Sequence, residues 1–277
     1  MTIKAIVLDI DGTLLNSQKE ISKKTKDVLI AAQAKGFKLI LASGRPTPGM
    51  KKCVEELEMA KYGGLIVSYN GASVIDCQSN ELLFNKALSI TESQEILEHM
   101  KNFDVKPMID KDDYMYVNDV FDNLISLPNQ EINIIEYEAR GGGYQLCEVA
   151  DLAKFVDFKL NKILIAGEPA YLLANVPEMK GPFTSKVSSM FTADCYYEFT
   201  ALGIDKAKAL DEVLPAFGIK GAELIAFGDG HNDRSLLEYA GLSVAMANAV
   251  PELKALADEV TLSNDQDGIA VMLEKYL

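Results

Sequence analysis

Short apolar runs alternate with longer amphipathic stretches at the start of the chain. The runs Lys4–Ile10, Phe37–Ala42 and Leu65–Tyr69 are unbroken and rich in branched side chains, which is typical of strands buried on both faces of a parallel sheet. Residues 22–35 predict a helix between the first two runs, with Ser22 as its N-cap. The order strand, helix, strand, helix, strand predicts parallel strands joined by right-handed connections.

This regular alternation stops near residue 70 and returns after Asp205. Asn70-Gly71 predicts a tight turn that leads from the third strand into another at 72–77. From about residue 88 to residue 194, strands and helices follow in no regular order. Residues 107–151 of this stretch hold ten acidic and two basic side chains, so most of the chain's negative charge lies there.

The pattern as a whole predicts an α/β protein of two domains. A chain of 277 residues exceeds the usual size of one domain. We predict a Rossmann-like parallel-sheet core built from residues 1–86 and 196–277. An α+β cap domain is expected as an insertion at residues 87–195.

Composition and charge exclude several classes of function. The hydrophobic content of 48% and charged content of 25% are ordinary for a globular protein, and no apolar run reaches the roughly 18 residues of a membrane span. A net charge of −14 should repel nucleic acid and anionic lipid. The N-terminal apolar run is too short for a secretory signal, and four widely spaced cysteines without a C-x-x-C pair fit a reducing cytoplasm. We therefore expect a cytoplasmic monomer or small homo-oligomer with no nucleic-acid or membrane partner.

Two carboxylates lie where the first predicted strand ends. Asp9 and Asp11 are two positions apart, so both should project at the carboxyl edge of the sheet, where open α/β folds bind ligands. Gly12 allows a sharp turn and the close approach of a ligand to the backbone. Like charges this close raise one pKa, which suits an acid/base group beside a nucleophile. The alternative is a solvated strand end with an ordinary turn.

A second group of polar residues follows the predicted strand that ends at Phe227. Asp229, Asn232 and Asp233 offer the oxygen ligands that Mg²⁺ prefers, and the next helix begins there. His231 is better explained as a solvated loop residue, since Mg²⁺ prefers oxygen. The alternative for the group is a polar loop that caps a helix.

Two weaker signals are consistent with the same site. Ser43-Gly44-Arg45 follows the second strand, so its hydroxyl and amides can receive an anion. Lys206 begins a predicted helix, where a positive charge is mildly unfavourable to the helix dipole and so indicates a specific use. A plain strand-to-helix turn and a solvated surface lysine are the respective alternatives.

Together these residues form a known pattern: D-x-D-G-T-L, then S/T-G-R, then a lysine, then G-D-x-x-N-D. The four elements occur in this order at 9–14, 43–45, 206 and 228–233. The chain resembles the haloacid dehalogenase superfamily, and specifically the Cof-like (type IIB) sugar-phosphate phosphatases, whose large cap lies between the second and third motifs. The resemblance covers essentially the whole chain.

Further stretches resemble the family, with small departures from its pattern. Ala207 follows the lysine where the family usually has glycine, and Met246-Ala247-Asn248 stands where it has M-G-N. The stretches Val244–Asn248 and Leu262–Gly268 also look like the family's. Neither departure removes a charged group.

The resemblance implies a Mg²⁺-dependent phosphatase that hydrolyses small phosphorylated metabolites, sugar phosphates in particular, through an aspartyl-phosphate. It implies Asp9 as the nucleophile, Asp11 as the acid/base and Lys206 as a further catalytic group. The implied metal ligands are Asp9, Asp11 through its carbonyl, Asp229 and Asp233. The implied substrate- and phosphate-binding residues are Gly12, Ser43, Gly44, Arg45, Lys206 and Asn232.

Two alternative functions stay open on the sequence alone. A phosphomutase has the same core but returns the phosphoryl group to a sugar, and the access of water under the cap decides between them. A receiver-like signalling module also uses clustered Asp, Ser or Thr, and Lys. Receivers are single small domains without the large insertion, so the enzyme interpretation is favoured.

Overall fold

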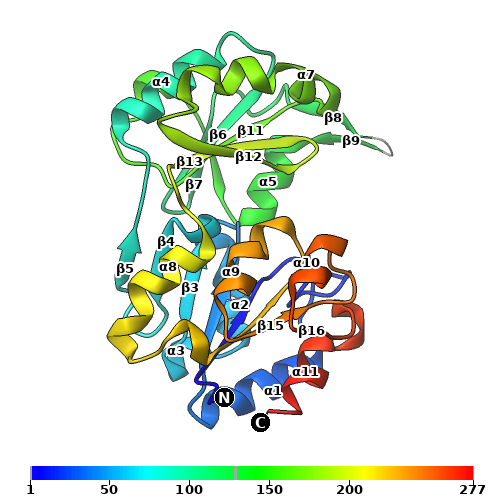
Figure 1. The fold of residues 1–277 in the computed structure, drawn as a ribbon. Coiled ribbons are helices and arrows are strands. Elements are labelled where there is room, and N and C mark those ends of the chain that lie inside the picture. The colour runs from blue at the N-terminus through cyan, green and yellow to red at the C-terminus, as the bar shows by residue number, and fades with distance from the viewer. Residues whose placement is uncertain (1, 128–129, 277) are drawn as a thin grey trace. The chain divides into compact units, whose positions relative to one another are not determined.

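The contacts within the chain divide it into two compact units. The computed structural model describes residues 2–127 and 130–276. The core unit comprises Met1–Asn85 and Asp205–Leu277, and the inserted unit comprises Lys86–Ile204 (Figure 1). The second boundary predicted from the sequence, between residues 195 and 196, therefore fell too early. Residues Tyr196–Ala201 form a strand that pairs with two strands of the inserted unit, so they belong to that unit.

A mixed eight-stranded sheet organises the described part of the core unit. Its order is β16-β15-β14-β1-β2-β3-β4-β5, in which β4 pairs antiparallel with both β3 and β5 and all other neighbours pair parallel. The strands are β1 (Ala5–Leu8), β2 (Lys38–Ala42), β3 (Leu65–Ser68), β4 (Ser73–Asp76), β5 (Leu82–Asn85), β14 (Leu224–Gly228), β15 (Leu242–Ala245) and β16 (Glu259–Val260).

The strand order places a ligand site at one edge of this sheet. From β1 the order runs one way to β2 and β3, and from β14 it runs the other way to β15 and β16. Right-handed connections then put helices on opposite faces, and the reversal between β1 and β14 is where open α/β sheets bind ligands. The helices of the core unit are α1 (Lys23–Ala34), α2 (Lys51–Glu56), α3 (Met59–Tyr62), α8 (Lys206–Val213), α9 (Arg234–Tyr239), α10 (Pro251–Leu256) and α11 (Gly268–Leu273).

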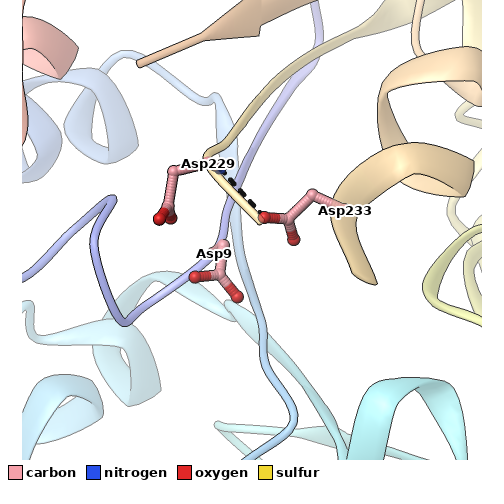
Figure 2. A group of neighbouring side chains, drawn as sticks. All are labelled: Asp9, Asp229 and Asp233. Atoms are coloured by element: carbon pink, nitrogen blue, oxygen red, sulfur yellow. Dashed lines mark hydrogen bonds between the residues drawn. The ribbon is translucent and has the colours of Figure 1, made fainter. Parts of the chain in front are cut away.

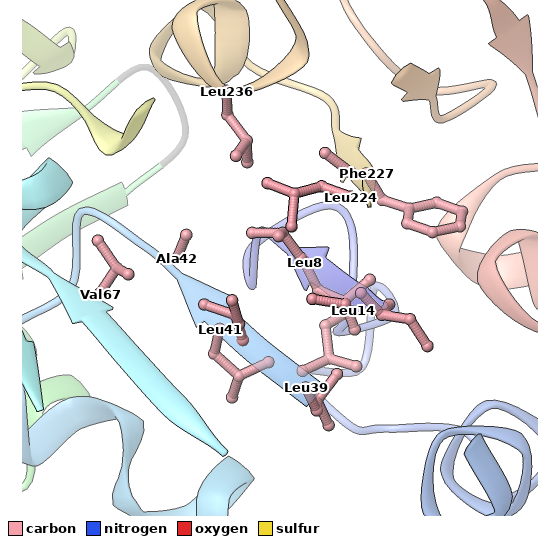
Figure 3. Close-up of a cluster of buried hydrophobic side chains, with 14 of the residues drawn as sticks. Leu8, Leu14, Leu39, Leu41, Ala42, Val67, Leu224, Phe227 and Leu236 are labelled. Atoms are coloured by element: carbon pink, nitrogen blue, oxygen red, sulfur yellow. The ribbon is translucent and has the colours of Figure 1, made fainter. Parts of the chain in front are cut away.

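The central strands are apolar because helices cover both of their faces. All four residues of β1 are buried, as are all residues of β3 and β14. Leu8, Leu41 and Phe227 are among the buried side chains of this core (Figure 3). Such strands lack the alternation of a sheet with one solvated face, which explains why unbroken apolar runs predicted them. The predicted α/β fold class is confirmed.

The inserted unit is built around a second sheet. Its order is β10-β7-β6-β11-β13-β12, and β8 and β9 pair antiparallel in a separate two-stranded sheet. Most of its pairs are antiparallel, as expected of an α+β cap. The strands are β6 (Lys106–Lys111), β7 (Tyr114–Val117), β8 (Leu124–Leu127), β9 (Gln130–Asn133), β10 (Gln145–Glu148), β11 (Ile163–Ala166), β12 (Val187–Ala193) and β13 (Tyr196–Ala201).

Two hydrophobic clusters lie on the two faces of this second sheet. In β11, Ile163 and Ile165 belong to one cluster, while Leu164 and Ala166 belong to the other, because successive side chains of a strand point to opposite faces. The first cluster includes side chains of α4 (Ile90–Met100), α6 (Leu152–Phe155) and α7 (Pro169–Lys180). The second includes side chains of α5 (Ile134–Gly142).

The sequence predicted no membrane-spanning helix and reduced cysteines. In the part of the chain that the structure describes, no helix has the length and apolar character needed to cross a membrane. Cys53, Cys77, Cys147 and Cys195 are all free thiols.

Candidate active site

Three aspartates converge at the carboxyl ends of β1 and β14. Asp9 directly follows β1, and Asp229 and Asp233 lie in the loop and short 3₁₀ turn after β14 (Figure 2). One carboxylate oxygen of each lies within 4.8 Å of the others. Because β1 and β14 are parallel neighbours, residues that are 220 or more positions apart meet at one edge of the sheet. The apolar runs predicted that both groups lie at strand ends, and the family resemblance implied that they share one site.

Lys206 joins two of these carboxylates. It is the first residue of α8, and its side chain is fully buried. Its Nζ lies 2.6 Å from Asp9 Oδ1 and 2.6 Å from Asp233 Oδ1. Burial lowers the pKa of this amine, but the two carboxylates outweigh burial and raise it above its usual value. The lysine therefore stays charged, and the alternative of a solvated surface lysine is wrong.

Burial and mutual repulsion raise the pKa of two of the aspartates. Burial first and the negative charge of Asp233 second raise the pKa of Asp9 to about 8, although Lys206 opposes both. Burial also raises the pKa of Asp229 to about 6. Like charge between Asp9 and Asp11 was expected to raise the pKa of one of the two carboxyl groups. The like charge that matters is Asp233, because the Asp11 carboxylate is engaged elsewhere.

Asp11 forms ion pairs with two basic side chains. Arg45 Nε donates to Asp11 Oδ2 at 2.6 Å and Arg45 Nη2 donates to Oδ1 at 2.8 Å, which is a bidentate pair. Lys19 Nζ donates to Oδ1 at 3.1 Å. Burial raises the pKa of this carboxyl, but the hydrogen bonds and charges of Arg45 and Lys19 outweigh it, so the pKa is lowered. The Lys19 contact was not predicted.

Asp233 shapes the loop that carries Asp229. Its Oδ2 accepts hydrogen bonds from the backbone amides of Asp229 and Gly230, each at 3.0 Å, and its Oδ1 accepts from Lys206. Asp229 Oδ1 accepts from the hydroxyl of Thr13 at 2.7 Å, a contact that the sequence analysis missed. In the contacts of the described residues, Asp9 and Asp229 each use Oδ1, so the Oδ2 atom of each can bind a ligand.

Asn70 links the second predicted motif to the fourth. Asn232 Nδ2 donates to Asn70 Oδ1 at 3.0 Å, and the backbone amide of Asn70 donates to the carbonyl of Ser43 at 2.9 Å. A Cβ added to Gly44 would lie 3.1 Å from the side-chain nitrogen Nδ2 of Asn70. Asn70 is buried. Its backbone is part of a turn, and its side chain packs at the site.

Gly12 is required by the aspartate cluster. Its φ of +82° lies in the left-handed region, and a Cβ at this position would lie 2.3 Å from Asp229 Oδ2. A glycine here therefore allows the turn after β1 to lie against the carboxylate of Asp229. His231 is exposed and is not one of the clustered residues, as its assignment to the loop surface predicted.

The sequence of the chain matches one protein family over nearly its whole length. Residues 6–273 match the profile of haloacid dehalogenase-like hydrolases. The chain therefore belongs to this family, and the predicted resemblance to it and to its Cof-like members is confirmed.

Relatives in this family include named phosphatases. The putative phosphatase YxeH of Bacillus subtilis is 29% identical over 277 residues, which cover 96% of each chain. The 5-amino-6-(5-phospho-D-ribitylamino)uracil phosphatase YitU of the same species is 25% identical, covering 98% of this chain and 96% of its own. A haloacid dehalogenase-like hydrolase from Bacteroides thetaiotaomicron has a crystal structure with a TM-score of 0.91 to this one, at 33% identity over 100% of both chains. The expected class of enzyme, a phosphoric monoester hydrolase, is thereby confirmed.

Proposed function

We propose that this chain is a Mg²⁺-dependent phosphatase that hydrolyses monoesters of small metabolites through an aspartyl-phosphate on Asp9. The observation that carries the proposal is the geometry at the end of β1. A buried carboxylate there is held at one oxygen by the buried ammonium of Lys206, while its second oxygen takes no part in the site's contacts. A carboxylate fixed in this way is suited to attack phosphorus in line with a leaving group.

The residues of the site fit a magnesium ion. The donor atoms are all oxygens, as Mg²⁺ prefers, and carboxylate oxygens of Asp9, Asp229 and Asp233 lie within 4.8 Å of one another. Asp9, Asp229 and the backbone carbonyl of Asp11 would hold the ion, with Asp233 as support behind them because its oxygens bind Lys206 and two amides. Bound Mg²⁺ supplies positive charge that offsets the phosphate dianion and favours the ionised form of Asp9.

The first half-reaction transfers the phosphoryl group to the enzyme. An oxygen of Asp9 forms a bond to phosphorus as the bond from phosphorus to the ester oxygen breaks, and protonated Asp11 gives its proton to that oxygen. The phosphoryl oxygens are held by Lys206, the hydroxyl of Ser43 and the side-chain amide of Asn232. The loops at Gly12 and at Gly44 bring their backbone close to the same oxygens. The negative charge that spreads over these oxygens is stabilised by fixed donors.

The second half-reaction releases phosphate. Water attacks phosphorus and gives a proton to Asp11, the bond from phosphorus to Asp9 breaks, and both carboxyl groups return to their starting state. Because Arg45 and Lys19 hold Asp11 as a carboxylate in this structure, Asp11 has to leave these partners in order to act as an acid. Substrate that draws Arg45 toward its own negative charge would free the carboxyl.

We propose small, singly phosphorylated substrates, with sugar phosphates the first class to test. The relative YitU acts on a phosphoribityl compound. Residues 107–151 of the inserted unit carry ten acidic and two basic side chains. Their negative electrostatic potential disfavours the binding of polyanions, and salt weakens this effect. Nucleic acids and bisphosphates are therefore expected to be poor substrates.

The test is a screen of phosphorylated metabolites for release of inorganic phosphate, with Mg²⁺ and with excess chelator. We expect release that stops on chelation and returns when Mg²⁺ is added back, and Asp229→Ala should resemble the chelated enzyme. Full activity in excess chelator would contradict the metal assignment. Transfer of phosphate to a second hydroxyl of a sugar, without release to water, would favour the phosphomutase alternative.

A further inference from the structure

Two stretches near the C-terminus have no role in the proposed reaction, yet they hold the loop that follows β1. Asn248 Nδ2 donates to the carbonyl of Gly12 at 2.8 Å. Asn264 Nδ2 donates to the carbonyl of Leu15 at 2.8 Å. The two asparagines also bind each other, because the backbone amide of Asn264 donates to Asn248 Oδ1 at 3.1 Å.

The same C-terminal stretch holds the loop further along. Asp265 Oδ1 accepts from the backbone amide of Ser17 at 2.7 Å, and Asp267 Oδ1 accepts from the hydroxyl of Ser22, the N-cap of α1. Side chains from the end of the chain thus bind backbone or capping groups at four points between residues 12 and 22. We call Asn248, Asn264, Asp265 and Asp267 the C-terminal brace.

The braced loop carries groups that the proposed reaction uses. Asp11 lies at its start, next to Gly12. Thr13 of the same loop donates its hydroxyl to Asp229. A shift of the loop would move the Asp11 carboxyl, whereas Asp9 is held separately by β1 and Lys206.

We propose that the two asparagines of the C-terminal brace are positioning residues that keep Asp11 within reach of the ester oxygen. This inference rests on the proposed role of Asp11 as the acid/base. Neither asparagine touches the carboxylate cluster in the contacts of the described residues. Asn248 is exposed and Asn264 is half-buried, so replacing either should change the free energy of unfolding little.

The consequence differs between substrates. An alkyl phosphate has a poor leaving group and needs the proton of Asp11 when the ester bond breaks, whereas an aryl phosphate needs little help. A misplaced Asp11 should therefore slow the alkyl ester more than the aryl ester. A general loss of folded enzyme would lower both rates equally.

The test compares Asn248→Asp, Asn264→Ala and the double variant with the unchanged enzyme on one alkyl and one aryl phosphate. Asn248→Asp removes the donor to Gly12 but keeps the acceptor for Asn264. At saturating Mg²⁺ and saturating substrate, we expect kcat on the alkyl ester to fall about 10-fold to 100-fold, the scale of a small misplacement. On the aryl ester we expect a loss of about threefold or less, since that ester depends little on the acid.

Asp258→Ala is the matched control. Asp258 is also an exposed residue of the core unit whose carboxylate binds a backbone amide, that of Ser243 at 2.9 Å. In the contacts of the described residues, its side chain binds Ser243 and not the braced loop. Its variant should keep the ratio of the two rates. Hydrogen exchange of the peptide that spans residues 12–22 should rise in the brace variants and not in the control.

Three outcomes separate the possibilities. A larger loss on the alkyl ester together with faster exchange in residues 12–22 supports the inference. Equal losses on both esters, or faster exchange with an unchanged ratio of rates, would overturn it. An unchanged enzyme that releases phosphate from neither ester would overturn the proposed function, and this inference with it.

Discussion

Asp9 and Asp11 are two positions apart but lie in opposite electrostatic environments. Asp9 is buried beside Asp233, which raises its pKa to about 8. Asp11 is partly exposed and bound by Arg45, and its pKa is lowered. The proposed nucleophile, Asp9, must be ionised, but its raised pKa favours the protonated form. The proposed acid, Asp11, must be protonated, but its lowered pKa favours the ionised form. Cation binding at Asp9 and movement of Arg45 away from Asp11 would supply both changes.

Substitution of each aspartate should separate the two half-reactions. Asp9→Asn should abolish turnover of every substrate, because the covalent intermediate cannot form. Asp11→Asn should still show a burst of phenol from an aryl phosphate and then stall, since the base for the second step is missing. General acid–base groups contribute about 10²–10⁴-fold, and we expect a loss in this range for steady-state turnover. Rapid quench with labelled aryl phosphate, followed by peptide mapping, measures both steps.

The location of the label decides the assignment. Label that accumulates on Asp9 in Asp11→Asn supports the two roles. Label on another residue, or turnover in Asp9→Asn, would contradict them. Long-lived label in the unchanged enzyme with negligible turnover would indicate a receiver-like module.

Asp9 should also make stability depend on pH when no cation is bound. Between its unfolded pKa of 3.8 and its folded pKa of about 8, the folded state holds a proton that the unfolded state has lost. Stability contributed by this residue therefore falls as pH rises through that range. Asp9→Asn has no such proton, so its free energy of unfolding relative to the unchanged protein should increase from pH 5 to pH 8 in excess chelator.

Urea unfolding of the two proteins at several pH values measures this difference. Mg²⁺ should stabilise the unchanged protein more than Asp9→Asn, because only the former supplies the Asp9 carboxylate. A difference that stays constant with pH would show that burial of Asp9 does not have the effect inferred from its surroundings.

At the scale of elements, the sequence predicted strands better than contacts between distant loops. Apolar runs marked β1 and β14, and the polar residues that end them marked the site. The donors Thr13 and Asn264 were missed because their partners lie more than 200 positions away, at Asp229 and Leu15. Only the order of the strands brings these groups together, and no local pattern shows it.

The turn after β3 is an element whose backbone is set by the site. Tyr69, Asn70 and Gly71 have φ values of +51°, +55° and +103°, so three consecutive residues are in the left-handed region. Such strain persists where surrounding structure requires it. Here Gly71 lies against the start of α8, and a Cβ on it would be 2.3 Å from the Asp205 carbonyl oxygen and 3.0 Å from Lys206 N.

Gly71→Ala should therefore be more harmful than Gly36→Ala. Gly36 also has a positive φ, +95°, but a Cβ there meets nothing within 4 Å. Gly36→Ala should cost about 1–2 kcal/mol for its backbone conformation alone. Gly71→Ala should cost about 1–3 kcal/mol more from overpacking, and it should lower kcat because the start of α8 carries Lys206. Thermal unfolding and kinetics of both variants test this, and equal effects would contradict it.

At the scale of the whole molecule, the insertion was predictable but its second boundary was not. The return of regular alternation after Asp205 indicated that the core resumes there. The predicted core nevertheless began at residue 196 and so included Tyr196–Ala201, which form β13 of the inserted unit. This strand pairs with β11 and β12 of the inserted unit. Such pairing joins strands that are distant in the sequence, so the residues of the strand alone do not show to which unit it belongs.

The division of the apolar core leads to a final prediction about the inserted unit. Among the described residues, no hydrophobic cluster mixes side chains of the two units. Residues 86–204 also fall in the usual size range of a domain. We therefore expect a fragment of these residues to fold alone and to unfold cooperatively in urea, as monitored by circular dichroism. Removing the core unit should therefore expose no hydrophobic cluster of the inserted unit and should leave every strand of its sheet with its partners.

Two variants of this fragment test whether the fold it adopts is the one described. Phe199 is fully buried in β13, in contact with the cluster that includes α4 and α7, so Phe199→Ala should cost about 3–5 kcal/mol. Phe121 is 85% exposed, and Phe121→Ala should change the free energy of unfolding by less than about 0.5 kcal/mol. Equal effects of the two substitutions would mean that the isolated fragment collapses without its native packing. A fragment with no cooperative transition would show that the inserted unit depends on the core unit for its stability.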